Sequence, residues 1–264
     1  METVLYAKNI QDLLAQLKNN MNLTVVGGCT KIEALPQKII SVWGIPELSQ
    51  ISRHERYFNV GPGTTLNDLL AIGQNHLPQI LHEALLSIAN PMIRNMATIG
   101  GNICSPGHKL TLFAPLMALE AKLEFKNQTE TKLEPIQSFK KVPEGFILSN
   151  IRIPYTNPEI SIFRKIGQEE KINEQSASFA FLADTENNAL IDVKLAFAGP
   201  FVFKSKSLEN SLIGHRLPFS KKEIDELQER IASEFEIAAT DQMLSNVLKQ
   251  QFLNLTRYSL EQLT

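Results

Sequence analysis

Two glycine pairs about seventy residues apart are the residues of this sequence best suited to chemistry. The first lies within residues 26–32, directly after an apolar run, and the second lies within residues 98–102. A glycine pair lets the backbone adopt a positive φ and lets a ligand approach it closely. Successive N–H groups in such a turn form a concavity that binds anions. The two turns together therefore predict one ligand with two phosphates held between them.

Short strands and capped helices are expected to position these turns. A strand over 23–26 leads into the first turn, and a helix over 82–88 ends before Asn90 and Pro91, ahead of the second turn. Further along, a β-hairpin around 184–188 precedes a helix that Ser220 and Glu223 open with a capping box. The fold class predicted from this pattern is α+β.

A domain boundary is expected near Pro154 to Pro158. The predicted domains are 1–157, made of two α+β subdomains over about 1–55 and 56–157, and 158–264, in which strands precede helices.

Composition narrows the function classes. A net charge of -2 gives no electrostatic reason to expect nucleic acid or a membrane surface as partner. We expect no membrane span, because no apolar run approaches the roughly 20 residues needed. We expect no secretory signal, because the first residues have no basic region leading into an apolar stretch. Two cysteines, Cys29 and Cys104, cannot supply the four thiolates of an iron–sulfur cluster. We expect a cytoplasmic protein with reduced thiols, and a redox role for the two cysteines is the alternative.

The most specific motif is Ile93-Arg94-Asn95-Met96-Ala97-Thr98-Ile99-Gly100-Gly101-Asn102. It matches the pattern i-R-N-x-A-T-I-G-G-N, and Gly27-Gly28-Cys29-Thr30-Lys31-Ile32 fits the pattern A-G-G-T-D-L. On these segments the chain resembles the FAD-binding subunit of the molybdenum hydroxylases. This is the group of xanthine dehydrogenase and of the medium subunit of carbon monoxide dehydrogenase.

The resemblance implies a flavoprotein with a fold of the vanillyl-alcohol-oxidase/PCMH-like type, followed by a smaller α+β domain. It implies that both turns donate backbone N–H groups to the FAD pyrophosphate. It also implies that electrons arrive from an iron–sulfur subunit and pass through flavin to an acceptor such as NAD, with a molybdopterin-binding subunit as a further partner. The cofactor-binding residues it implies are Val26, Gly27, Gly28, Cys29, Thr30, Lys31, Ile32, Thr98, Ile99, Gly100, Gly101, Asn102 and Lys165.

The sequence departs from the family pattern at several of these places. Cys29 stands where the first motif usually has its second glycine, and Lys31 replaces an acidic residue. The segment after Asn102 is shorter than usual and lacks an aspartate. Of the pattern F-x-K-x-G-x-R, Lys165 matches, whereas Glu169 replaces the arginine.

Other interpretations remain open at this point. The departures leave room for a scaffold subunit that keeps the fold without binding FAD tightly, and for a lone FAD oxidase. Arg94 is expected to support a loop by binding carbonyl groups, with phosphate binding as the alternative. The histidines have no metal-ligand spacing, so neither a metal site nor a catalytic residue is predicted.

Overall fold

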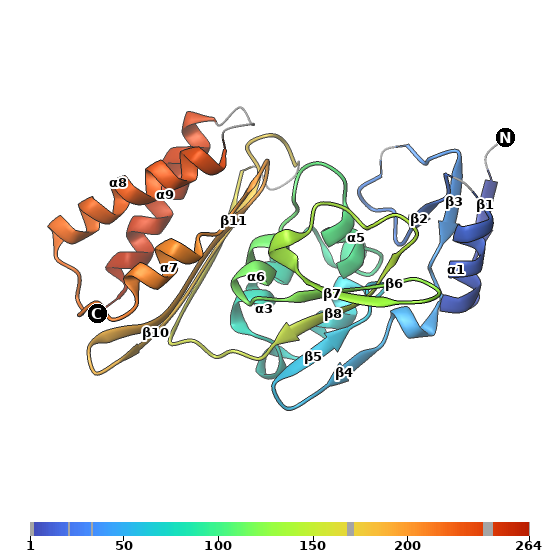
Figure 1. Cartoon of the computed structure of the whole chain (residues 1–264), viewed down its shortest axis with the longest axis horizontal. Helices are drawn as coiled ribbons and strands as arrows, with labels where there is room; N and C mark the ends of the chain where they lie inside the picture. Colours follow the sequence, from blue (N-terminus) through green and yellow to red (C-terminus); the bar gives the residue numbers. More distant parts are fainter. Residues whose placement is uncertain (1–2, 21, 33, 168–171, 240–244, 264) are drawn as a thin grey trace. The chain divides into compact units, whose positions relative to one another are not determined.

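The computed structural model of the chain describes residues 3–20, 22–32, 34–167, 172–239 and 245–263 (Figure 1). The chain forms two compact units. Unit 1 comprises Met1–Leu77, Ile88–Pro106 and Glu120–Tyr155, and unit 2 comprises Pro78–Ser87, Gly107–Leu119 and Thr156–Thr264. Two internal segments thus belong with the C-terminal part of the chain. The predicted division at residue 157 and the subdomain limits stay predictions.

Unit 1 begins with a small parallel sheet covered by one helix. Strands β1 (Thr3–Tyr6), β3 (Lys38–Ser41) and β2 (Thr24–Val26) lie side by side in that order. Helix α1 (Ile10–Asn19) is capped by Asn9, whose side chain accepts from Asp12 N. Leu13 and Ile40 are fully buried between helix and sheet. Strand β2 ends where the first glycine turn begins.

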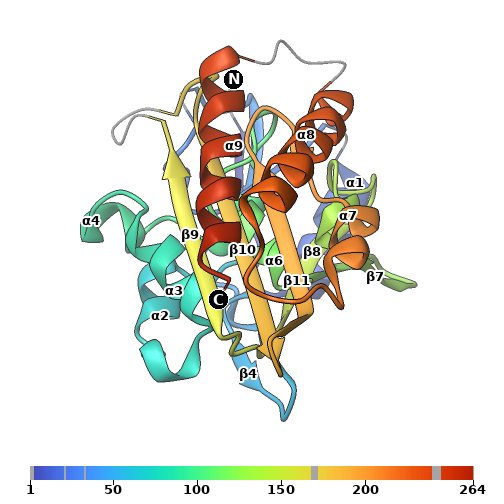
Figure 2. The same cartoon turned by 90° about the vertical axis from the view of Figure 1, so that its left-hand side faces the viewer.

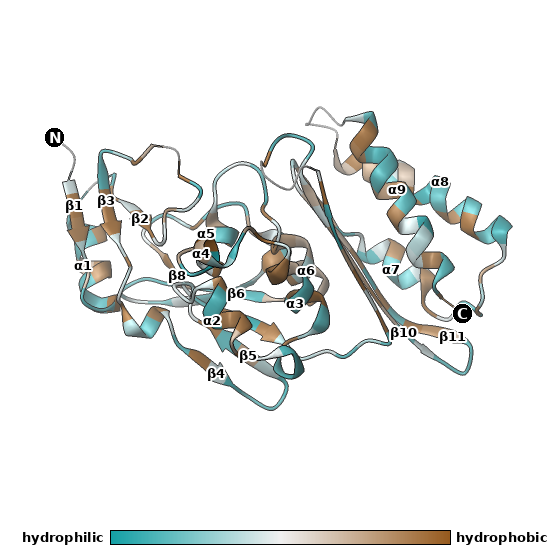
Figure 3. Ribbon diagram, turned by 180° about the vertical axis from the view of Figure 1, so that it is seen from behind, coloured by the Kyte–Doolittle hydropathy of each residue, from teal (hydrophilic) through white to brown (hydrophobic). Residues whose placement is uncertain are grey.

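The second layer of unit 1 is a sheet of five described strands in the order β4-β5-β8-β6-β7, in which every neighbouring pair is antiparallel. These strands are β4 (Ile51–Arg53), β5 (Tyr57–Val60), β6 (Lys122–Lys126), β7 (Thr131–Pro135) and β8 (Ile147–Pro154). The short helices α2 (Leu66–Leu70), α4 (Pro91–Arg94) and α5 (Ile99–Cys104) lie on one face of it (Figures 1 and 3). Single 3₁₀ turns occur at Pro46–Leu48, Gln74–His76 and Ile136–Ser138.

Unit 2 is a sheet with helices on both faces (Figures 1 and 2). Its described strands, in spatial order, are β12 (Val202–Phe203), β11 (Ala189–Ala198), β10 (Ala177–Glu186) and β9 (Ile160–Ile166). Helices α3 (Gln79–Leu86) and α6 (Phe113–Ala118) pack on one face. Helices α7 (Lys206–Leu212), α8 (Lys221–Ala238) and α9 (Asn246–Glu261) cover the other.

A cluster of phenylalanines fills the space between this sheet and its helices. The Phe235 and Phe252 rings stack with centroids 3.9 Å apart, and Phe197 meets both edge-on. The predicted capping box opens α8, because Ser220 and Glu223 exchange both hydrogen bonds. Strands, hairpins and capped helices together confirm the predicted α+β class. Among the helices that the structure describes, none is long and apolar enough to cross a membrane.

Candidate functional site

The first glycine turn presents a row of free backbone donors. In the described part of the chain, no hydrogen-bond acceptor is found for the N–H groups of Gly27, Gly28, Cys29, Thr30 or Lys31. The two glycines are half-buried, whereas the next three residues are exposed. Such a run of N–H groups is the donor set that a phosphate group requires.

Cys29 adopts a left-handed conformation, with φ of +54°. Its thiol donates to the carbonyl oxygen of Gly27 at 3.4 Å, across the turn. Side chains cost free energy in this region, which explains why the family pattern has glycine at this position. Cys29 therefore has local backbone strain that a glycine at this position would not have. The N–H groups of the turn are not used in hydrogen bonds within it.

The second turn uses its backbone N–H groups inside the protein. Thr98 caps helix α5. The four bonds run from Ile99 N to Thr64 O (3.0 Å), Gly100 N to Pro62 O (2.8 Å), Gly101 N to Thr98 Oγ1 (3.0 Å) and Asn102 N to Thr98 O (3.0 Å). The backbone N–H groups of 99–102 thus have acceptors within the protein, and contact of this turn with a phosphate stays a prediction.

The two turns nevertheless meet, as predicted. A Cβ built on Gly27 would lie 3.2 Å from Thr98 Oγ1, and one built on Gly28 would lie 1.7 Å from the carbonyl oxygen of Met96. The backbone of the first turn therefore rests directly on the second motif. A turn whose glycines lie against the second motif, with free N–H donors along it, fits a pyrophosphate group.

Residues 62 and 64, which hold the second turn, were not predicted as part of the site. Thr64 Oγ1 is 1% exposed and has no hydrogen-bond partner among the described residues. The sequence signal was Gly61-Pro62-Gly63, a turn directly before the cap Thr65. The spacing alone does not show that this loop supplies the acceptors for residues 99 and 100.

Arg94 supports a loop, as the sequence favoured. The side chain is 8% exposed, and its Nη1 donates to the carbonyl oxygens of Ile88 (2.8 Å) and Ala89 (2.9 Å). Ala89 has a φ of +44°, so the guanidinium fixes a turn that alanine rarely adopts alone.

The remaining predicted contact, Lys165, lies in unit 2. Its Nζ donates to the carbonyl oxygen of Ser87 at 3.3 Å, at the end of α3. The neighbouring His108 bonds the carbonyl oxygen of Ser176 through Nε2. Glu169, which replaces the arginine of the family pattern, lies outside the described residues.

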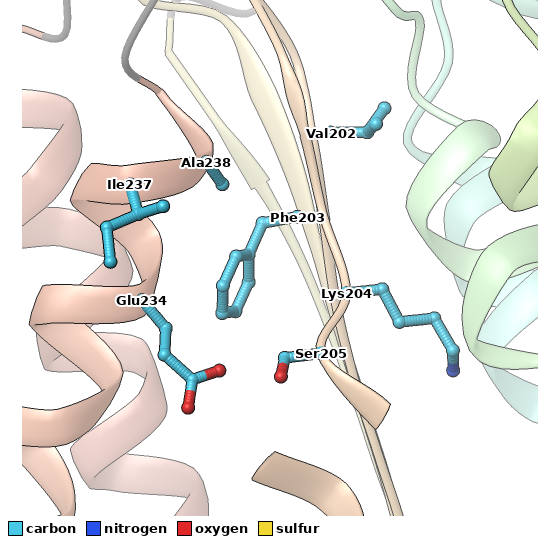
Figure 4. A pocket seen from close by; sticks show the side chains of 7 residues that line it. All are labelled: Val202, Phe203, Lys204, Ser205, Glu234, Ile237 and Ala238. Atoms are coloured by element: carbon cyan, nitrogen blue, oxygen red, sulfur yellow. The ribbon is translucent and has the colours of Figure 1, made fainter. Parts of the chain in front are cut away.

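Unit 2 also contains an open cavity of about 290 Å³ between β12 and α8 (Figure 4). Glu234 faces it and is paired with Arg230 at 3.2 Å. The side chain of Lys204 points away, to a buried pair with Glu209 at 3.0 Å. No residue predicted from the sequence lines this cavity. Within the described ranges, no group of three or more His, Cys, Asp or Glu could hold a metal ion.

The chain is similar to a family of known proteins over more than half of its length. Residues 1–156 match the family described as the FAD binding domain in molybdopterin dehydrogenase. The glyceraldehyde dehydrogenase medium chain of Sulfolobus acidocaldarius is 25% identical over 228 residues, which is 80% of each chain. The xanthine dehydrogenase FAD-binding subunit of Escherichia coli O157:H7 is 35% identical over 108 residues, covering 40% of this chain and 37% of that subunit.

The fold also matches a solved structure. A crystal structure of Cu,Mo-CO dehydrogenase in its cyanide-inactivated form superposes with a TM-score of 0.82 at 19% identity. The match covers 99% of this chain and 95% of that one. At this level of identity the likeness is one of fold.

Proposed function

This chain belongs to the family of FAD-binding domains in molybdopterin dehydrogenases, and we propose that it is an electron-transfer subunit of a molybdenum hydroxylase complex. In this proposal FAD is held by unit 1, electrons come from an iron–sulfur subunit, and they leave to an acceptor such as NAD. A molybdopterin-binding subunit completes the complex and selects the substrate.

The observation that carries the proposal is the row of free N–H groups over 27–31. Backbone amides can surround a pyrophosphate without placing a full positive charge beside the flavin. Gly28 lets this row close onto the carbonyl of Met96, so the donors are ordered before the ligand arrives. Preordered donors bind more tightly, because less conformational entropy is lost on binding.

Side chains of both turns add to this cradle in our proposal. The hydroxyl of Thr98 accepts from Gly101 N and keeps its own proton to donate to a phosphate oxygen. Thr30 and Lys31 are exposed beside the free N–H groups, and Asn102 follows on α5. We keep Lys165 as a flavin contact on the family resemblance, and its bond to Ser87 O holds the ammonium in place.

When bound, FAD supplies the exchange between one-electron donors and a two-electron acceptor. The chain's own residues bind and orient the cofactor, and none is assigned as an acid or a base. The partner chains are proposed to carry the metal centres, because the described residues hold no group suited to a metal ion. Neither Cys29 nor Cys104 forms a disulfide with a described residue, and we keep the cytoplasm as the proposed compartment.

The test is a titration of the purified full chain with FAD, followed by quenching of flavin fluorescence and by calorimetry. We expect saturable binding at one FAD per chain, and we expect ADP to compete because the cradle holds the pyrophosphate. A chain that is colourless as purified and gives no heat with FAD would refute the proposal.

A second candidate, a scaffold subunit without tightly bound flavin, is favoured by one specific observation. The N–H groups of 99–102 already have acceptors, so half of the predicted backbone clamp is not open to a ligand. Copurification with partner subunits in the absence of flavin would support this candidate. Flavin in the purified complex, bound by this chain, would exclude it.

A further inference from the structure

A row of cations crosses the five-stranded sheet of unit 1. Arg152 on β8 lies opposite Asn59 on β5 and opposite Lys122 on β6. Residues in one cross-strand row point to the same face of a sheet. Phe58, Leu123, Ile151 and Ile153 occupy the alternate positions and are buried, so this row is on the opposite face. Two like charges directly opposite each other destabilise a sheet.

Arg152 is held in place within this row. Its Cζ lies 4.4 Å from the centroid of the Tyr57 ring, and its Nε donates to Asn59 Oδ1 at 3.5 Å. His54 contacts both of these partners of Arg152. Its ring stacks with that of Tyr57, with centroids 4.5 Å apart, and its Nε2 is hydrogen-bonded to the Asn59 amide nitrogen at 3.2 Å. A guanidinium fixed in this way loses little freedom when its remaining N–H groups bind an anion.

Among the described residues, no carboxylate lies within 4.0 Å of Arg152, Lys122, Arg53 or Arg56, the last two at the β4–β5 hairpin. Glu124 lies two residues from Lys122 on β6 and accepts from the Ser149 hydroxyl at 2.6 Å. Glu55, at the tip of the hairpin, is exposed.

Unit 2 differs in this respect, since many of its cations have acidic partners. Its ion pairs among the described residues include Lys194–Asp192, Lys204–Glu209, Lys222–Glu226, Arg230–Glu234, Lys249–Glu236, Arg257–Asp225 and Arg257–Glu261. Arg152 and Lys122 carry their positive charge without such a partner, although the whole chain has a net charge of -2.

We propose that this surface, called here the Arg152 face (His54, Tyr57, Asn59, Lys122 and Arg152), docks an acidic segment of a partner protein chain. Neighbouring strands are about 4.8 Å apart, so the charged row is wider than one phosphate group. An extended segment with acids at alternate positions presents carboxylates about 6.8 Å apart, which suits a row of separate cations. The fixed guanidinium of Arg152 would take one carboxylate through two parallel hydrogen bonds.

The probe is a fluorescein-labelled ten-residue peptide of alternating glutamate and serine, mixed with the full chain and followed by anisotropy. Arg152→Gln and Lys122→Gln each remove one charge from the face. The control Lys222→Gln removes one exposed charge from unit 2, where Lys222 pairs with Glu226 at 3.6 Å. We expect each of the first two changes to weaken binding at least about fivefold, and the control to change it less than about twofold. Binding should also weaken as salt is raised.

Lys122→Gln keeps the proposal testable if Arg152→Gln disturbs the Tyr57 contact, because Lys122 is exposed and makes no such contact. Lys122→Gln removes the repulsion between Lys122 and Arg152, so the unfolding temperature of this variant should rise while its affinity for the peptide falls. Equal weakening by all three variants, or no binding of the peptide, would overturn the proposal. Inorganic phosphate that binds the face as tightly as the peptide would overturn the choice of a protein partner. The FAD affinity of both variants should equal that of the parent chain. A chain that binds the peptide but not FAD would therefore refute the proposed flavin function and leave the docking proposal standing.

Discussion

A Cβ atom on Gly28 would lie 1.7 Å from the carbonyl oxygen of Met96. The two glycine turns therefore meet backbone to backbone within unit 1. The second turn bonds its own N–H groups to Pro62, Thr64 and Thr98, and so forms a fixed support. The first turn rests on this support with its donors free. The two motifs thus differ: the N–H groups of the second bond to the protein itself, and those of the first have no acceptor among the described residues.

Gly28→Ala should damage both the fold and the site. The added methyl group must push the two turns apart, and overpacking of this kind costs about 1–3 kcal/mol. Because the donors of 27–31 move with the turn, FAD affinity should fall at least about tenfold, which is about 1.4 kcal/mol. Urea unfolding and FAD titration of the same preparation measure the two effects.

Gly145→Ala is the matched control in unit 1. Its Cβ would meet nothing within 4 Å, and its φ of +76° makes the strain of a left-handed alanine the main cost. Stability should fall by about 1 kcal/mol, and FAD affinity should stay unchanged. If Gly28→Ala bound FAD as well as this control, the contact with Met96 would have no part in holding the cofactor.

Cys29→Gly tests whether the cradle acts through its backbone. Glycine adopts the φ of +54° without strain, and the N–H group of residue 29 is retained. We expect FAD affinity to stay within about threefold of the parent chain or to rise. Isothermal calorimetry at matched ionic strength measures it. A loss of binding beyond tenfold would show that the thiol itself contacts the ligand.

Arg94→Gln should destabilise unit 1 strongly. The change removes two hydrogen bonds from a charged donor and leaves the carbonyl groups of Ile88 and Ala89 without partners. We expect a loss of about 2–4 kcal/mol in the free energy of unfolding. Arg94→Lys should recover only part of it, because an ammonium lacks the planar fork. Full recovery with lysine would mean that charge alone, and not geometry, supports the loop.

Local signals in the sequence predicted the elements well. Asn9, Thr65 and Ser220 cap helices in the structure through the side-chain bonds that their residue types favour. The hairpin around 184–188 forms where two apolar strands, Ala177–Glu186 and Ala189–Ala198, flank a short polar turn. These features depend on residues a few positions apart, so the sequence contains the information needed to predict them.

The site was harder to predict because its decisive contacts are between distant segments. The motif over 98–102 was identified, but the acceptors of its N–H groups lie at Pro62 and Thr64, more than thirty residues earlier. A glycine pair allows either a ligand or a protein carbonyl to approach, and the residue types do not distinguish the two. Gly100, predicted as a ligand contact, is buried, and its Cβ would lie 2.5 Å from the Cβ of Pro62.

The acid dependence of stability should report on the capping box of α8. The Ser220 hydroxyl and backbone N–H both donate to Glu223 Oε2, at 2.6 and 2.8 Å, and these bonds lower the pKa of Glu223 below its ordinary value of 4.5. A pKa lowered by folding adds stability above the ordinary value, and this stability is lost as pH falls through the folded value. The parent chain should therefore be more stable than Glu223→Gln at neutral pH, and the two should converge as pH falls through the lowered pKa of Glu223. Thermal unfolding of both proteins from pH 7 downward measures the difference in stability between them. Asp12, whose pKa is also lowered, does not affect this difference because both proteins contain it. A constant difference across this range would mean that the Glu223 charge does not contribute to the cap.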